Sequence, residues 1–437
     1  MNGDMDGDMN GDMGGDMDGD VARAGRSSSP LRIVVLCPHF DPDTAPTGRV
    51  MSRIVHELAV LGHELHVVTA LPWYRTHSIE PGWGGRVVRT ERVDFGSITR
   101  LHPFPGGDRR NLLRRAAGFG AFSALAGLMG LRAGGWFRRA DAVLAMSPPL
   151  TLGLTGWAVG LGHRAPLVFN IQDVFPDAAI ETGAITGRRI IGVASWLERL
   201  SYRRSSAVTV LSEDLADNVR AKLPMGRRGD VHVIPNFVDT EQLRPADRMT
   251  TYRTQLGIGS EPVVLYAGNV GFSQSLDLVL AAARALPDVT FLINGEGAAR
   301  STLEHDAAGI PNVRFGDFQP AERLNEVLAT GDVHVVPLRR GLGRVSVPSK
   351  TYSILAAGRP VVAAIDPGTE VPRMLTASGG GIAVPPDDPV AFTAAVRELV
   401  GRDDLGAPLG AAGRAWVESA ASPAAVAAAY EALIDRR

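Results

Sequence analysis

A lysine stands beside hydroxyl side chains in the segment from Arg344 to Tyr352, and this combination could bind a phosphate. Lysine is otherwise nearly absent, because the chain of 437 residues contains only two. The residue pattern predicts a helix that begins around Lys350 and ends at Gly358. A helix N-terminus offers free backbone amides to an anion, and a basic side chain there adds a charged hydrogen bond. A lysine that merely faces solvent is disfavoured at this position, since the helix dipole repels cations. We therefore predict phosphate contacts from Arg344, Ser349 and Lys350.

Two glycine-containing turns could bring backbone amides close to a diphosphate. Gly48 lies between an expected strand over residues 31–37 and an expected helix over residues 49–61. Gly271 lies in the turn that follows an expected strand over residues 263–267, together with the polar side chains of Asn269 and Gln274. A capped helix start explains Gly48 equally well, and an ordinary turn is the alternative for Gly271. We predict donor contacts from these four residues.

Polar groups also follow two other expected strands. Asp173 comes after a strand over residues 166–170, close to Asn170 and Gln172, and a structural turn explains this cluster equally well. Glu370 follows a strand over residues 360–364, where its carboxylate could bind a ribose diol. A glutamate in the first turn of a capped helix is the alternative for Glu370. The hypotheses are a catalytic role for Asp173 and a nucleotide or sugar contact for Glu370.

The sequence predicts neither a metal site nor a redox cofactor. Asp41-Pro42-Asp43 matches a metal-binding D-x-D pattern, but the central proline favours a turn. The histidines lack metal-ligand spacing. Cys37, which is the one cysteine, ends an apolar run and is expected to be a buried apolar residue. No G-x-G-x-x-G motif follows the first strand, so the nicotinamide-binding fingerprint is missing.

Short apolar runs alternate with amphipathic segments along the chain, a pattern typical of doubly wound α/β domains. The expected strands cover residues 31–37, 64–69, 142–146, 166–170, 208–211, 231–234, 263–267, 289–293, 333–336, 360–364 and 382–384. We predict a first Rossmann-like domain over residues 30–245 and a second over residues 246–420. A C-terminal helix over residues 421–437 could pack on either domain. Ligands of such sheets bind beyond the carboxyl ends of the strands, which makes a shared cleft the expected site.

The N-terminal segment differs from this pattern. Residues 1–29 contain tandem M-x-G-D repeats and are predicted to be a disordered tail. The segment lacks the basic and apolar regions of a signal peptide. Omitting the seven aspartates of residues 1–20 changes the formal net charge from −2 to +5, which is too weakly basic to indicate a nucleic-acid partner. Together with the single cysteine, these features suggest a cytoplasmic protein.

Two apolar stretches could contact a membrane. Residues 142–163 carry no charge, but Pro148-Pro149 favours a buried strand, turn and helix over a membrane span. Residues 109–139 place arginines on both sides of an uncharged run with apolar residues at helical spacing. Such a helix could lie in an anionic membrane interface, and a core-facing helix is the alternative. The apolar residues of this stripe are Phe119, Phe122, Leu125, Leu128 and Met129.

Four segments together resemble family 4 glycosyltransferases with the GT-B fold, in which two Rossmann-like domains face each other across a cleft. They are Gly62-His63-Glu64-Leu65-His66-Val67-Val68-Thr69, Ile234-Pro235-Asn236-Phe237-Val238-Asp239, Asn294-Gly295-Glu296-Gly297 and Leu355-Ala356-Ala357-Gly358-Arg359-Pro360. Residues 268–271 and 347–350 resemble the subgroup of O-antigen and colanic-acid-type surface polysaccharides. The resemblance implies a metal-independent hexosyltransferase that retains anomeric configuration and takes a nucleotide-diphosphate sugar. It also implies a lipid-linked or cell-envelope glycan acceptor and a peripheral place on the inner face of the plasma membrane.

The chain departs from the family pattern at several positions. The usual arginine and lysine fall on Asn269 and Gln274, and the usual glutamate pair falls on Val345 and Ser353. Arg344 and Lys350 are predicted to replace the phosphate contacts, and Glu370 to replace the diol contact. The usual catalytic histidine has no clear match, and Asp173 is nearest to its place. These losses leave a non-catalytic scaffold or regulatory subunit as an alternative, and a nucleotide-cofactor oxidoreductase is a weaker one.

Overall fold

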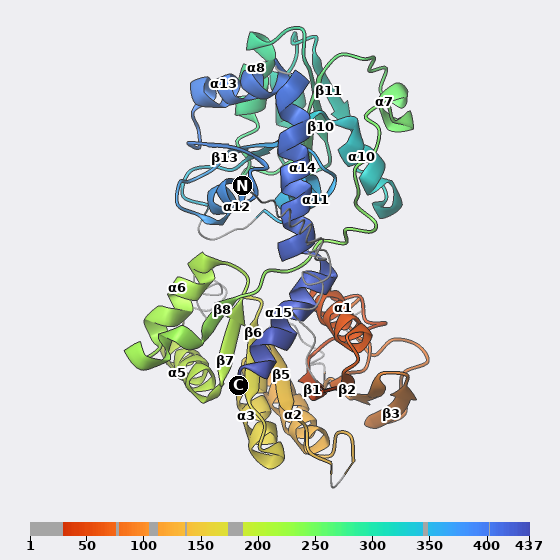
Figure 1. Ribbon diagram of the computed structural model, residues 1–437, viewed down its shortest axis with the longest axis vertical. Coiled ribbons are helices and arrows are strands. Elements are labelled where there is room, and N and C mark those ends of the chain that lie inside the picture. Colours follow the sequence, from red (N-terminus) through yellow and green to blue (C-terminus); the bar gives the residue numbers. More distant parts are fainter. Residues whose placement is uncertain are drawn as a thin grey trace, which may run out of the picture.

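A computed structural model describes residues 29–75, 78–104, 112–135, 138–173, 187–343, 348–401 and 403–437. The described strands form two separate sheets, one in each lobe of the molecule (Figure 1). The first sheet ends at Val233 and the second begins at Val263, so the connection between the lobes runs between these residues. This arrangement confirms the predicted α/β class with two Rossmann-like domains.

The first sheet has eight strands in the order β3-β4-β2-β1-β5-β6-β7-β8. They are β1 (Arg32–Leu36), β2 (Glu64–Ala70), β3 (Val88–Val93), β4 (Gly96–Leu101), β5 (Ala142–Ser147), β6 (Leu167–Ile171), β7 (Ala207–Val210) and β8 (Val231–Val233). Helices α1 (Pro46–Val60), α2 (Leu112–Gly130), α3 (Thr151–His163), α5 (Arg188–Arg204) and α6 (Glu213–Lys222) and the 3-10 turn η1 (Met225–Asp230) accompany it. The central strands β1 and β5 are almost entirely buried, as their aliphatic sequences predict for parallel strands covered on both faces.

The hairpin of β3 and β4 is a feature that the sequence did not reveal. β3 pairs antiparallel with β4, whereas the other pairs of this sheet are parallel. β3 lies at the sheet edge and carries the exposed side chains of Arg89 and Arg92, so it lacks the apolar run by which most of the other strands were recognised.

The second sheet is entirely parallel and has six strands in the order β11-β10-β9-β12-β13-β14. They are β9 (Val263–Ala267), β10 (Thr290–Asn294), β11 (Val313–Gly316), β12 (Val333–Pro337), β13 (Val361–Ala364) and β14 (Gly381–Val384). The accompanying helices are α7 (Thr251–Gln255), α8 (Asp277–Ala285), α9 (Arg300–Asp306), η2 (Ala321–Arg323), α10 (Leu324–Thr330), α11 (Lys350–Ala356), α12 (Glu370–Ser378), α13 (Pro389–Val400) and α14 (Asp403–Ala420). The last helix of the chain is α15 (Pro423–Asp435). The predicted helix start at Lys350 is confirmed.

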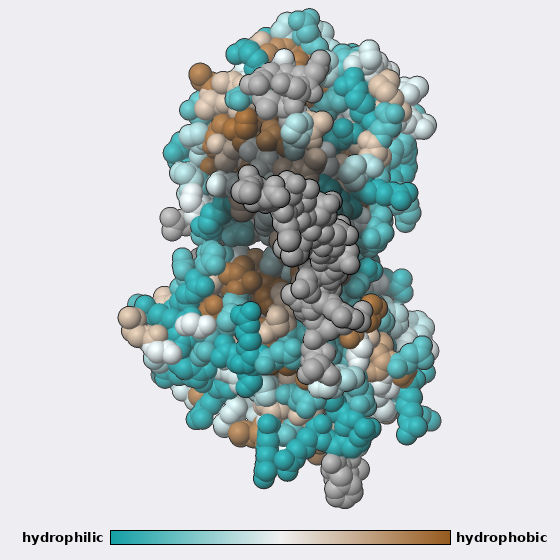
Figure 2. Space-filling model, viewed as in Figure 1, coloured by the Kyte–Doolittle hydropathy of each residue, from teal (hydrophilic) through white to brown (hydrophobic). Residues whose placement is uncertain are grey.

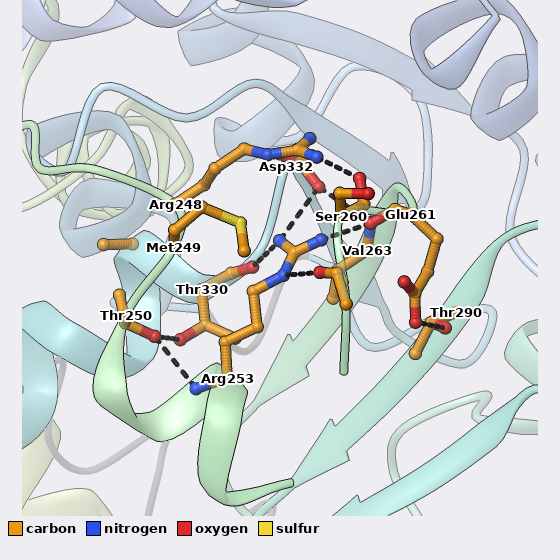
Figure 3. Close-up of polar contacts among 12 residues, drawn as sticks. Arg248, Met249, Thr250, Arg253, Ser260, Glu261, Val263, Thr290, Thr330 and Asp332 are labelled. Carbon is orange, nitrogen blue, oxygen red and sulfur yellow. Dashed lines mark hydrogen bonds and ion pairs between the residues drawn. The ribbon is translucent and has the colours of Figure 1, made fainter. Parts of the chain in front are cut away.

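A buried arginine fixes the connection between the lobes to the second sheet (Figure 3). Arg253 of α7 is fully buried and donates hydrogen bonds to the backbone carbonyls of Gly259, Glu261 and Thr330. It also contacts Asp332, whose carboxylate accepts from the backbone amide of Val263 at 2.8 Å. Because these bonds satisfy a buried charge at the amino ends of β9 and β12, the connection is held firmly to the second lobe.

The C-terminal helix α15 crosses back to the first lobe (Figure 1). It packs along α1, and Tyr430 is buried in the same apolar cluster as β1. The Tyr430 hydroxyl lies 2.7 Å from the Asn170 amide, and Glu431 Oε1 lies 3.1 Å from His63 Nε2. α14 packs on α11 and α12, so the last two helices together connect the lobes.

The apolar stripe predicted to face a membrane covers the first sheet instead. Phe122 and Ala126 of α2 are buried in the core, and Leu125 and Met129 pack against the same cluster. Most of this stripe therefore faces the core, as the core-facing alternative expects, whereas Leu128 is exposed. Residues 105–111 and 136–137 lie outside the described ranges. Within the described ranges, no helix has both the length and the hydropathy of a transmembrane segment.

Candidate active site

The carboxyl ends of the strands in the two sheets face each other. α6 follows β7 and α12 follows β13, and the starts of these two helices touch. The backbone amide of Glu213 donates to Glu370 Oε2 at 3.3 Å, and Arg373 forms an ion pair with Asp214 at 2.7 Å. The space-filling surface is indented between the lobes at this level (Figure 2). This is the edge at which parallel α/β sheets bind ligands.

Lys350 places an ammonium group at the carboxyl edge of the second sheet. Its Nζ donates to Tyr266 Oη at 2.9 Å and lies 4.0 Å from the centre of the tyrosine ring. Burial lowers the pKa of Lys350 to about 8, because an apolar environment disfavours the charged form. Among the described residues no carboxylate forms an ion pair with this lysine. An anionic ligand would therefore gain a charge-assisted hydrogen bond and stabilise the ammonium form.

Two glycine turns pack directly beside this lysine. The backbone of Gly268 and of Gly295 has φ values of +141° and +142°, which glycine adopts without strain. A Cβ on Gly295 would collide with the carbonyl oxygen of Gly268. A Cβ on Gly268 would lie 3.0 Å from Lys350 Nζ. The turns after β9 and β10 therefore form a close-packed floor that only glycine permits, next to the one lysine of this lobe.

The backbone amide predicted at Gly271 has an internal partner. It donates to the Gln274 side chain at 3.1 Å, so neither residue is free in the way that a diphosphate cradle requires. The Tyr266 hydroxyl donates to the carbonyl of Asn269 at 2.5 Å, and the Asn269 side chain is exposed. Of the three contacts predicted in this turn, Asn269 is the one that the structure leaves open to a ligand.

The remaining phosphate contacts are only partly described. Ser349 is exposed and directly precedes α11, with no side-chain hydrogen bond to the helix end. Arg344 lies outside the described residues. On the same edge, the Asp366 carboxylate accepts from the amides of Gly341 at 2.8 Å and Gly343 at 3.1 Å. These bonds hold the chain that leads into residues 344–347.

Glu370 has a different setting from the one predicted. Its carboxylate accepts from the Glu213 amide and from Arg373, both at 3.3 Å, and so belongs to the contact between the lobes. Burial raises its pKa, while these hydrogen bonds oppose the shift. The structure thus gives Glu370 a role in joining the lobes, where a ribose contact was expected.

Asp173 is the exposed member of the polar cluster after β6. Gln172 donates to Asn170 at 2.8 Å and accepts from Asn236 at 3.0 Å, and both Asn170 and Gln172 are buried. These two side chains are therefore structural, as one of the two interpretations anticipated. The Asp173 side chain remains open to solvent at the carboxyl edge of the first sheet.

A histidine–aspartate pair follows β1 on the same edge. His39 Nδ1 and Asp43 Oδ2 lie 2.7 Å apart, and the Asp43 side chain is completely buried. The His39 ring stacks on Trp73 with ring centroids 5.6 Å apart and meets the edge of Tyr74 at 5.5 Å. This packing fixes the imidazole, which is largely but not fully enclosed. Asp43 is the second aspartate of the D-x-D pattern, and in the structure its carboxylate contacts His39.

Gly48 supports this histidine rather than opening a helix to a ligand. α1 begins at Pro46, earlier than expected, so Gly48 lies within its first turn and is buried. A Cβ at this position would lie 2.8 Å from His39 Cβ. The glycine therefore allows α1 to approach the histidine, and its phosphate contact stays a prediction.

The described residues include no group of three or more His, Cys, Asp and Glu side chains arranged to hold a metal ion. Burial raises the pKa of the Cys37 thiol to about 12. A thiol that stays protonated is a poor nucleophile, which agrees with its prediction as a buried apolar residue.

Known protein families match both lobes. Residues 47–236 match the Glycosyl transferase 4-like domain, and residues 261–402 match the Glycosyl transferases group 1 family. The chain is 26% identical over 384 residues to a protein of Escherichia coli K12 named as a colanic acid biosynthesis glycosyl transferase, WcaI, covering 85% of this chain and 92% of the relative. The chain belongs to the family 4 glycosyltransferases. It is also 28% identical over 307 residues to a Pseudomonas aeruginosa protein named as the glycosyltransferase WbjE, covering 68% of this chain and 74% of the relative.

Solved structures agree on the fold of this glycosyltransferase. The crystal structure of Anabaena HepE in complex with UDP superimposes with a TM-score of 0.62 at 14% identity, covering 93% of this chain and 100% of that one. This likeness confirms the expected GT-B architecture, in which two α/β domains form one molecule. The resemblance seen in the four sequence segments is thus confirmed at the level of family and fold.

Two features of this glycosyltransferase were missed from sequence. Tyr266, whose hydroxyl accepts a hydrogen bond from Lys350, lies inside an apolar strand. Nothing in the sequence of that strand indicated a contact with Lys350. His39 was one of the histidines without metal-ligand spacing, and Asp43 was assigned to a turn. Their spacing of four residues was the available signal, but the segment is not helical, so the spacing alone did not predict a contact.

Proposed function

We propose that this glycosyltransferase transfers a sugar from a nucleotide-diphosphate sugar, held by the second lobe, to a glycan acceptor that enters from the first lobe. The position of Lys350 carries this proposal. Its ammonium group would neutralise the charge that develops on the leaving diphosphate, and such electrostatic stabilisation is commonly the largest contribution to catalysis. Arg344 and Ser349 are proposed to join it, and Asn269 to contact the nucleotide or sugar.

In the proposed reaction the two substrates supply every atom and electron pair that is needed. The bond between the anomeric carbon and the diphosphate oxygen breaks, and the acceptor hydroxyl oxygen bonds to that carbon. The hydroxyl proton passes to the leaving diphosphate. Attack from the face of the leaving group would retain anomeric configuration, without a required metal, and both features are inferred from the resemblance to the family. Closure of the lobes would exclude water and limit hydrolysis of the donor.

The acceptor is proposed to bind at the carboxyl edge of the first sheet, between Asp173 and His39. A fixed imidazole supported by a buried carboxylate is suited to orienting a hydroxyl group, and the half-exposed Tyr74 offers a ring to a sugar face. The relative WcaI is named for colanic acid biosynthesis, which supports a surface-polysaccharide acceptor. We propose a lipid-linked glycan at the inner face of the plasma membrane.

One alternative has a specific observation in its favour. The glutamate pair of the family is replaced by Val345 and Ser353, and Gln274 is used within its own turn. A scaffold or regulatory subunit with a transferase fold would explain these losses, and it predicts no sugar transfer with any donor. An oxidoreductase is the weaker alternative and predicts tight binding of NAD(P).

A thermal-shift panel tests the proposed donor site. The protein lacking residues 1–29 would be melted with UDP, GDP, ADP, dTDP, their common sugars and NAD(P). A ligand at 100 times its Kd adds about 2.7 kcal/mol to the free energy of unfolding, which raises Tm visibly. We expect a rise with one nucleoside diphosphate that is lost in Lys350→Gln and kept in Arg397→Gln, a control on α13. No rise with any nucleotide would favour the scaffold, and a rise with NAD(P) alone would favour the oxidoreductase.

A further inference from the structure

Helix α5 exposes large apolar side chains in a setting of positive charge. Val193 and Trp196 lie one turn apart, with 66% and 61% of their surface exposed. Ile190, at the edge of the same face, is 47% exposed. The exposed arginines of this helix are Arg188, Arg189, Arg199, Arg203 and Arg204. Exposed apolar side chains that lie together and are rimmed by charged residues are typical of an interaction surface.

The single acidic residue of α5 lies on the opposite face. Glu198 is buried, accepts a hydrogen bond from Tyr202 at 3.1 Å and pairs with Lys222 at 2.6 Å. Ser201 and Tyr202 are buried beside it, where α5 packs on α3. The helix is thus anchored through its C-terminal half by its own carboxylate. Its solvent face carries only apolar and positively charged side chains.

These exposed side chains converge on one side of the helix. At 100° per residue, Trp196 lies at the centre of the exposed face, with Arg189 and Val193 on one side of it and Arg199 and Arg203 on the other. Tryptophan and arginine are the side chains that suit the interface of a lipid bilayer, where the ring enters the headgroup region and the guanidinium groups meet phosphates. The interspersed charge argues against an apolar protein partner, which would bury these guanidinium groups at a high cost.

The direction of α5 brings this face towards the site. β7 begins at Ala207 on the amino edge of the sheet, so the end of α5 at Arg204 lies at that edge. The helix has 17 residues, and its first turns therefore lie roughly 24 Å away, in the direction of the carboxyl edge. A surface bound there would lie on the same side of the lobe as Asp173 and the proposed acceptor.

We propose that α5 docks this protein on an anionic lipid bilayer through Val193, Trp196 and the arginines around them. This inference deepens the proposed function, since it names the surface that would deliver a lipid-linked acceptor. It places the membrane-facing surface on α5, because most of the apolar stripe of α2 packs towards the core. Each arginine near an anionic surface adds attraction that salt weakens, so the binding is expected to fall with ionic strength.

Vesicle co-sedimentation of the full chain tests the proposal directly. The probes are vesicles of phosphatidylglycerol and phosphatidylcholine, and vesicles of phosphatidylcholine alone, without any sugar donor. We expect binding to the anionic vesicles, about tenfold or more weaker in Arg189→Gln/Arg199→Gln and in Val193→Ser/Trp196→Ser. The matched control is Val390→Ser/Arg397→Gln, which changes the exposed side chains of α13 in the second lobe and should bind as the parent does.

Several outcomes would overturn the proposal. These are equal binding to both kinds of vesicle, unchanged binding in both α5 variants, or an equal loss in the α13 control. Absence of vesicle binding, with an oligomer in light scattering that the α5 variants dissociate, would make this face a contact between copies of the chain. The nucleotide thermal shift of the α5 variants separates the two proposals. If docking fails while that shift remains, only the membrane inference is lost, and the reverse result removes the donor site alone.

Discussion

At the scale of single residues, the account depends first on how burial lowers the pKa of Lys350. Lys350 is pressed against Tyr266 and carries a pKa of about 8, whereas a solvated lysine would stay charged far above that pH. Its position was predictable because a lysine at a helix start, in a chain nearly devoid of lysine, is conspicuous. Its tyrosine partner was not, since nothing in an apolar strand signals which side chain will meet it.

The pKa of Lys350 predicts a pH dependence. The ammonium form predominates below pH 8 and is lost as the pH rises through that value, so kcat/KM for the donor should fall on the alkaline side. Lys350→Arg, which keeps its charge, should remove this alkaline fall even if it lowers the plateau. The measurement is kcat/KM of the parent protein and of Lys350→Arg from pH 6.5 to 9.5. Identical alkaline profiles would show that another group titrates.

The pair of His39 and Asp43 makes a second prediction at this scale. Asp43→Asn keeps the shape of the buried side chain but removes the charge that fixes the imidazole. We expect kcat/KM for the acceptor to fall by about tenfold or more, with an unchanged thermal shift by the nucleotide. A loss confined to nucleotide binding would contradict the placement of the acceptor on the first lobe.

At the scale of elements, apolar patterning predicted most strands but not how each surface is used. β1 and β9 were recognisable because buried parallel strands read as aliphatic runs. The edge strand β3 was missed because its charged residues face solvent. The stripe on α2 was correctly seen as apolar, yet periodicity does not tell a core from a membrane. Only the packed structure shows that this stripe covers the first sheet, while α5 leaves its tryptophan exposed.

The glycine turn after β10 gives a test of the floor beside Lys350. In Gly295→Ala the new Cβ would collide with the carbonyl of Gly268, and the φ at this position is one that alanine rarely adopts. We therefore expect the free energy of unfolding to fall by several kcal/mol and nucleotide binding to be lost. Gly192→Ala on α5 is the control, because it has open space and a helical backbone, and should stabilise by about 0.5–1 kcal/mol. Chemical denaturation measures both. Equal stability of the two variants would refute the close packing.

At the scale of the whole molecule, the two lobes are joined by contacts from distant parts of the sequence. α15 returns from the second lobe to pack on α1, and Glu370 and Arg373 meet the start of α6. The sequence predicted α15 as a helix, but its amphipathic pattern did not say which lobe it covers. That choice is made by Tyr430, whose hydroxyl lies 2.7 Å from the Asn170 amide in the first lobe.

Tyr430→Ala should therefore destabilise the first lobe although it lies at the end of the chain. Removing a buried aromatic ring costs about 3–5 kcal/mol, and the cavity would open next to β1 and α1. Differential scanning calorimetry should show a lower Tm for the first lobe, and a nucleotide should still raise the Tm of the second. A drop confined to the second lobe would contradict the observed packing of α15.

The most direct test of the central claim is transfer of a labelled sugar. The full chain would be incubated with each radiolabelled nucleotide-diphosphate sugar and with lipid-linked acceptors extracted from bacterial membranes. We predict that one donor labels the lipid fraction and that Lys350→Ala, folded as judged by its melting curve, lowers the rate by about a hundredfold or more. Full activity of Lys350→Ala would remove this lysine from the mechanism, and no labelled product with any donor would contradict the proposed transfer itself.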